Sequence, residues 1–91
     1  MQKEIVYLGS EGNTVQKEGK NKGRAYYVHT FLMGNEPFKV FEFANDMGIF
    51  KFNDFITTNG VDKLDLMNGK FEIYAKEGKL NVVLTGIERV L

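Results

Sequence analysis

Apolar residues occur along this chain in short runs that are separated by glycine and asparagine. The runs are rich in Val, Ile, Phe and Tyr, the residue types that favour β-strands. Ten glycines and a single proline provide the breaks. The pattern predicts five strands, at about residues 4–8, 24–33, 38–43, 70–76 and 80–90. The first is expected to stop at the glycine-containing stretch 9–12 and to resume near 14–16.

Turn residues join the predicted strands at two places. Gly34-Asn35-Glu36-Pro37 predicts a turn before the third strand, and Glu77-Gly78 predicts a tight turn between the last two. Gly86 predicts a bulge or a bend inside the last strand.

The connection between the third and fourth predicted strands contains a helical pattern. Three of its apolar residues lie at helical spacing: Phe52, Phe55 and Ile56. Asn53 is the expected N-cap and Asn59-Gly60 the expected stop, which predicts one short helix. A later apolar group is expected to form an irregular segment that plugs one end of a barrel: Leu64, Leu66 and Met67.

Three strands, a long connection and a final hairpin follow one another in the order of the oligonucleotide-binding (OB) fold. Other small β-barrels, such as the SH3-like kind, seldom place a long connection between their third and fourth strands. A chain of 91 residues has room for one hydrophobic core. The sequence therefore predicts a single all-β domain over residues 1–91, a five-stranded OB-fold barrel with a long connection and one short helix between strands three and four.

Composition restricts the classes of protein that fit. The chain is 43% hydrophobic and 13% aromatic, which is enough apolar surface for it to fold on its own. It contains no cysteine, so disulfides and thiolate metal sites are excluded. The N-terminal residues lack an apolar signal sequence, and the apolar runs are far shorter than a membrane span. We therefore expect a soluble, cytoplasmic protein with no membrane partner.

Few residues are suited to catalysis. The one histidine, His29, lies in the middle of a predicted strand, where a packing role is commoner than a role as general base. The one serine, Ser10, lies in a predicted turn. Asp62 and Asp65 are close in sequence, but acidic pairs in loops are usually solvated or capping groups. We expect no enzyme activity, no catalytic residues, no metal ion, no cofactor and no small-molecule substrate.

Charge is balanced over the chain but unevenly placed. Twelve basic and twelve acidic residues give zero net charge, which argues against a polycation that coats nucleic acid by bulk charge. Between Lys17 and Arg24, however, four cations stand against Glu18 alone. The stretch 42–65 is acidic, with five carboxylates against two lysines. An anion-binding site is therefore expected at the basic loop.

Two tyrosines follow the basic loop directly. Single-stranded nucleic acid needs cations for its phosphates and flat rings on which unpaired bases stack. Because side chains alternate along a strand, one face carries Arg24, Tyr26, Val28 and Thr30, and the other carries Ala25, Tyr27, His29, Phe31 and Met33. We expect the first face to lie outside, with Tyr26 as the stacking ring. The competing assignment, which a strand bulge near the loop would allow, turns Tyr26 inward. The second face is expected to place Phe31 and Met33 in the core, and to direct Tyr27 and His29 inward or toward a partner with their polar atoms hydrogen-bonded.

The third predicted strand is apolar on both faces. Phe41 and Phe43 share one face with Lys39, and the other face carries Phe38, Val40 and Glu42. A closed barrel made from one chain leaves one of these faces in water. Burial against a second subunit or against bases would resolve this. We therefore expect a homodimer, and we expect Lys39 among the residues that contact nucleic acid.

Three segments together resemble one known family. Gly23-Arg24-Ala25-Tyr26 leaves the basic loop, Gly34-Asn35-Glu36-Pro37-Phe38 leads into the third strand, and residues 70–91 form the final hairpin. Each is similar to the corresponding segment of the filamentous-phage single-stranded DNA-binding proteins of the gene V protein type. The chain departs from that family in its shorter hairpin, which has no aromatic residue at its tip, and in its longer middle connection.

The resemblance implies an OB-fold protein that works as a dimer and coats newly made single strands in the cytoplasm. It implies that the loop cations contact phosphates and that the next tyrosine stacks on a base: Lys17, Lys20, Lys22, Arg24 and Tyr26. Val28 falls where the family has an apolar residue on the same face, and either Tyr74 or no residue at all takes the place of the aromatic at the family's hairpin tip.

The predicted function is a sequence-tolerant single-stranded DNA-binding protein that coats or protects single strands during phage or plasmid replication or transfer. RNA is also compatible, because stacking and phosphate contacts serve both polymers. The alternative is a small β-barrel protein-interaction or assembly subunit that does not bind nucleic acid.

Overall fold

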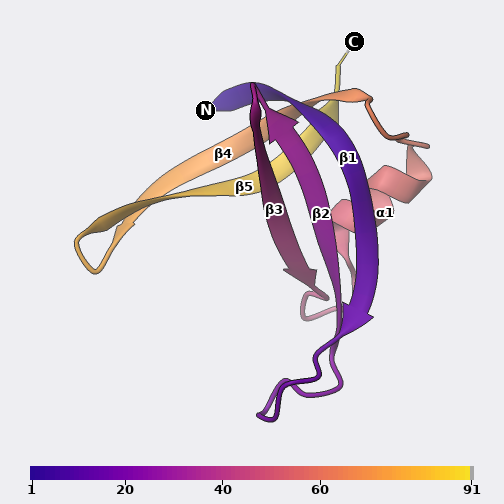
Figure 1. Ribbon diagram of the computed structural model, residues 1–91, viewed down its shortest axis with the longest axis vertical. Coiled ribbons are helices and arrows are strands. Elements are labelled where there is room, and N and C mark those ends of the chain that lie inside the picture. Colours follow the sequence, from indigo (N-terminus) through magenta and orange to yellow (C-terminus); the bar gives the residue numbers. More distant parts are fainter. Residues whose placement is uncertain (91) are drawn as a thin grey trace.

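The computed structural model describes residues 1–90, which form one antiparallel five-stranded sheet and one helix (Figure 1). In chain order the elements are β1 (Gln2–Thr14), β2 (Ala25–Met33), β3 (Glu36–Phe43), α1 (Lys51–Thr58), β4 (Leu66–Lys76) and β5 (Lys79–Arg89). The strands lie in the order β3-β2-β1-β4-β5. The predicted all-β fold, with its helix between the third and fourth strands, is confirmed. No helix in this part of the chain has the length and apolar character needed to cross a membrane.

The sheet is strongly curved but does not close into a full barrel. Its two end strands, β3 and β5, face each other across a hollow of about 280 Å³ instead of pairing. The rings of Phe38 in β3 and Phe71 in β4 lie 6.0 Å apart, centroid to centroid, beside this gap. Pro37 lies in β3 and has no N–H to donate, which suits an end strand. The β4–β5 hairpin extends away from β3 (Figure 1), and this divergence separates the two edges.

Strand β1 is longer than predicted, because the glycine-containing stretch 9–12 belongs to it. A β-bulge between Tyr7 and Gly9 replaces the expected interruption. Gly9 has φ 134°, a conformation that glycine adopts far more easily than other residues. Residues 2–6 pair with β4, and the strand pairs with β2 through Thr14. The bulge therefore lets one strand turn the corner of the curved sheet.

One hairpin turn is shorter than the sequence predicts, and the other has the predicted length. β2 and β3 are joined by Gly34 and Asn35 alone, since Met33 pairs with Glu36. The predicted tight turn between the last two strands is confirmed, with positive φ at both Glu77 and Gly78, as a type I′ hairpin requires. The bulge predicted near Gly86 is also confirmed by a shift in the β4–β5 register.

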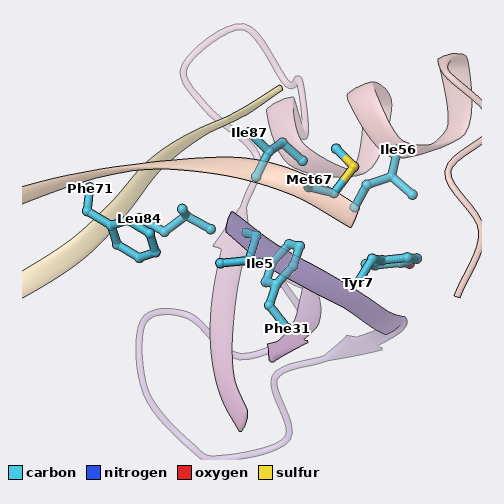
Figure 2. Close-up of a cluster of buried hydrophobic side chains, with 8 residues drawn as sticks. All are labelled: Ile5, Tyr7, Phe31, Ile56, Met67, Phe71, Leu84 and Ile87. Atoms are coloured by element: carbon cyan, nitrogen blue, oxygen red, sulfur yellow. The ribbon is translucent and has the colours of Figure 1, made fainter. Parts of the chain in front are cut away.

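Eight buried apolar side chains form the core (Figure 2): Ile5, Tyr7, Phe31, Ile56, Met67, Phe71, Leu84 and Ile87. The prediction for Phe31 is confirmed. The prediction for Met33 is wrong: it is 37% exposed, because it lies next to the turn and beyond the core. The expected irregular plug is also wrong, since Leu66 and Met67 begin β4 and only Met67 is buried.

The side chain of Glu42 in β3 caps helix α1, in place of the predicted Asn53. Asn53 lies inside the helix, and its N–H donates to Oε1 of Glu42 in β3 at 3.1 Å. The N–H of Phe52 donates to Oε2 of the same carboxylate at 2.6 Å. A carboxylate here satisfies free N–H groups and complements the positive end of the helix dipole. The helix ends at Asn59 and Gly60, as predicted.

The same carboxylate belongs to a network of hydrogen-bonded side chains that joins four elements. His29, fully buried in β2, hydrogen-bonds through Nε2 to Glu42 Oε1 at 2.8 Å and through Nδ1 to Ser10 Oγ at 2.6 Å. Ser10 in turn contacts the Tyr7 hydroxyl at 2.7 Å. The expectation that His29 points inward with its polar atoms hydrogen-bonded is confirmed. This network fixes β1, β2, β3 and α1 relative to one another.

We predict that Glu42→Gln lowers the free energy of unfolding by about 1–3 kcal/mol, because the amide nitrogen cannot accept a hydrogen bond and a buried donor loses its partner. Urea unfolding followed by circular dichroism measures this. Glu36→Gln, at an exposed position on the same strand, is the control and should change stability by less than about 0.5 kcal/mol. Equal stability of the two variants would contradict the role given to Glu42.

Candidate nucleic-acid interface

The outer face of β2 and β3 brings together the residues that the sequence assigned to binding. Three cross-strand pairs form this face: Tyr26 with Phe43, Val28 with Phe41, and Thr30 with Lys39. The neighbouring residues His29, Phe31 and Glu42 are buried, so strand alternation turns these three pairs outward. The predicted orientation of the second strand is confirmed.

An aromatic patch, consisting of Tyr26, Phe41 and Phe43, lies at the centre of this face. The Tyr26 ring centroid is 6.2 Å from that of Phe41 and 5.7 Å from that of Phe43. Phe41 is 64% exposed and Phe43 is 38% exposed, while Tyr26 is half-buried between them. Tyr26 therefore contacts both phenylalanines, its ring is tilted by 32° and 42° to theirs, and the three rings form an apolar surface that remains partly open to water.

Arg24 lies at one edge of the aromatic patch. Its guanidinium carbon is 4.4 Å from the centroid of the Phe43 ring, which is a cation–π contact. One guanidinium nitrogen also donates to the Asn21 side-chain oxygen at 3.0 Å. These contacts hold the charged group against the patch while it stays exposed.

The basic loop before β2 is closed at its base by backbone hydrogen bonds. The N–H of Val15 donates to the Arg24 carbonyl at 2.9 Å, and the N–H of Gly23 donates to the Val15 carbonyl at 2.9 Å. Lys17 and Lys20 are exposed in this loop. Lys22 forms an ion pair with Glu18, so part of its charge is already balanced.

Of the eight predicted site residues, Tyr74 is the one that the structure does not bring to this surface. It lies in β4 opposite Asn81, in the hairpin that extends away from β2 and β3 (Figure 1). The other seven lie in the basic loop or on the outer face, with Val28 and Lys39 at the far side of the aromatic patch from the loop.

Two aromatic residues of the patch, Phe41 and Phe43, were not among the predicted site residues. Their place beside Tyr26 could have been predicted from the sequence. A two-residue turn at Gly34 and Asn35 fixes the β2–β3 register, and this register pairs Phe43 with Tyr26. Lys63 also reaches this surface, from the connection between α1 and β4. No local pattern indicated Lys63, since a contact between distant segments brings it there.

Together, the loop and the face offer exposed cations next to exposed rings, with Glu11 of β1 as the acidic neighbour opposite Val28.

Neither protein-family models, nor curated proteins, nor solved structures show a significant match to this chain. Inferences about its function therefore depend on the geometry and chemistry of this surface.

Proposed function

We propose that this protein binds single-stranded nucleic acid on the outer face of β1, β2 and β3, with little dependence on sequence. The observation that carries the proposal is the aromatic patch of Tyr26, Phe41 and Phe43 with Arg24 stacked at its edge. In the cytoplasm, such a protein coats or protects single strands during phage or plasmid replication or transfer.

Stacking explains why an apolar patch of this kind stays open to water. Unpaired bases present flat faces, and each base stacked on an aromatic ring contributes about 1–3 kcal/mol. Every base has such a face, so the contact tolerates any sequence. Bases in a duplex are already stacked on their neighbours, which makes single strands the preferred ligand. The contact does not distinguish DNA from RNA.

The loop cations supply the second half of the interaction. Lys17, Lys20 and Arg24 belong to the basic loop that leads into β2 and are exposed to solvent, and Arg24 contacts Phe43 of the patch. A strand whose bases stack on the rings can therefore extend its phosphates toward the loop. The resemblance to the gene V protein type agrees with this division of roles, because that family also pairs loop cations with a tyrosine on the following strand.

We further propose that the protein works as a homodimer through its β4–β5 hairpin. One face of the hairpin continues outward from the buried pair Phe71 and Leu84 and is apolar but exposed: Ile73, Ala75, Leu80 and Val82. Leu80 is 78% exposed and Val82 is 57% exposed. A contiguous group of exposed apolar side chains on an isolated chain is unfavourable in water.

A second copy of this chain is the occupant that the surface fits. A two-fold axis places the same apolar face opposite itself, so no charged group has to be buried. The sequence predicts a dimer through the apolar faces of the third strand, and the family resemblance also implies one. In the structure Phe38 and Val40 pack against the core, and Phe41 and Phe43 belong to the aromatic patch, so the hairpin carries the proposal. If the hairpin instead received a different protein, the assembly-subunit function would be favoured.

We predict that oligo-dT binds the protein and that its affinity falls as salt rises, with a slope of log K against log salt of about −0.7 per phosphate contact and about three to five contacts. Tyr26→Ala should weaken binding by roughly tenfold or more, because a stacked base is lost. Fluorescence anisotropy at several salt concentrations measures both effects.

Two further variants provide the controls for this experiment. Tyr26→Phe should bind nearly as well as the unmodified protein, because stacking uses the ring and not the hydroxyl. Tyr74→Ala removes a tyrosine that lies outside the face and should also bind normally. Absence of binding at low salt, or equal losses in Tyr26→Ala and Tyr74→Ala, would refute the proposed site.

We predict that Val82→Lys converts the protein from a dimer to a monomer, because each copy would bury an unpaired charge in the hairpin interface. Sedimentation velocity at micromolar concentration should show twice the chain mass before the change and the chain mass after it. Asn81→Lys places the same charge on the opposite face of β5 and should remain dimeric. A monomeric unmodified protein would rule out this interface.

A further inference from the structure

We propose that a hollow beside the β1 bulge binds one phosphate of the single strand, and that Lys39 and Lys63 hold it. The proposal rests on the proposed function and extends it, because a second phosphate position defines the path of the bound strand across the sheet. The hollow has a volume of about 180 Å³ and opens on the outer face. It is lined by Gly9 and Glu11 of β1, Val28 and Thr30 of β2, and both lysines.

Backbone hydrogen bonds position Lys63 beside the bulge. The N–H of Leu64 donates to the Tyr7 carbonyl at 2.7 Å, and the N–H of Tyr7 donates to the Asp65 carbonyl at 3.0 Å. The residues that follow Lys63 are therefore attached to β1 next to the irregular pairing at Tyr7 and Gly9. The lysine comes from a segment far away in sequence, but its backbone position is fixed.

The side chain of Lys63 lies directly against the bulge. A Cβ atom at Gly9 would come within 3.2 Å of Lys63 Cε, so the absence of a side chain at Gly9 makes room for the lysine stem. The end of this exposed side chain therefore lies over the backbone of Gly9, and Lys63 contributes to the lining of the hollow.

Charge and size make the hollow suitable for a phosphate. Two lysines line it and Glu11 is the one acidic residue of the lining, to which Thr30 also belongs. Within residues 1–90, neither Lys39 nor Lys63 forms an ion pair. The volume of 180 Å³ is several times the ~30 Å³ share of one water molecule in the liquid, which leaves space for a phosphate group. Charge-assisted hydrogen bonds from lysine to phosphate are among the stronger polar contacts.

The position of the hollow gives the strand its path. Arg24 lies at one end of β2, the aromatic patch follows, and the hollow begins at Val28 and Thr30. From Arg24 to Thr30 a strand extends about 20 Å, at about 3.3 Å per residue. A single strand can therefore run along β2, with phosphates at Arg24 and at the lysine pair and bases on the rings between them.

The test compares Lys63→Gln with Lys3→Gln, which removes the same charge from the part of β1 that pairs with β4. Oligo-dT affinity is measured at several salt concentrations. Lys63→Gln should make the salt slope shallower by about 0.7, the share of one phosphate contact, while Lys3→Gln leaves the slope unchanged. Glu11→Gln should raise the affinity, because it removes the one carboxylate of the hollow.

The outcomes separate this proposal from the function on which it rests. If the unmodified protein binds oligo-dT but Lys63→Gln has the slope of Lys3→Gln, the phosphate site is refuted and the proposed function stands. If Glu11→Gln weakens binding, the hollow is not an anion site. If the unmodified protein does not bind oligo-dT at low salt, both the function and the phosphate site are refuted. Inorganic phosphate should compete better than chloride of the same ionic strength for the unmodified protein, and this difference should disappear in Lys63→Gln. Equal competition by the two salts in the unmodified protein would refute a phosphate site in the hollow.

Discussion

The buried carboxylate of Glu42 accepts hydrogen bonds from His29 and from the first turn of α1, and these contacts hold the C-terminal end of β3 toward the interior. Because strand side chains alternate, an inward Glu42 turns its neighbours Phe41 and Phe43 outward. The same reasoning applies to β2, where the inward His29 leaves Val28 facing outward. The stability of the interior and the composition of the binding face therefore depend on one polar network.

The bulge at Tyr7 and Gly9 is the second constraint, and it acts through shape. It lets β1 pair with β2 on one side and β4 on the other, which curves the sheet. It also receives the chain after α1 and brings Lys63 to the surface that carries the aromatic patch. The buried carboxylate thus fixes which rings face outward, and the bulge fixes the position of Lys63 beside them. An alternating pattern of apolar and polar residues alone does not determine either position.

Local patterns predicted much of this structure, and the failures have a common physical cause. Alternation and turn residues predicted the strands, the helix and the outward face of Tyr26, because these depend on neighbours in sequence. The cap of α1 and the position of Lys63 depend on contacts between segments far apart in the chain. The continuation of β1 through residues 9–12 was missed because glycine marks both turns and bulges. Tyr74 lies away from the other predicted site residues, because a resemblance to a hairpin tip does not show where that hairpin points.

Backbone amide chemical shifts, followed while oligo-dT is added to isotope-labelled protein, test most directly whether the outer face of β1, β2 and β3 is the binding surface. If it is, the largest changes will occur in the basic loop, at Tyr26 and Phe41, and near Lys63, while the β4–β5 hairpin tip around Gly78 stays unchanged. Changes confined to the hairpin, or no changes at saturating oligonucleotide, would contradict the assignment of this face to single-stranded nucleic acid.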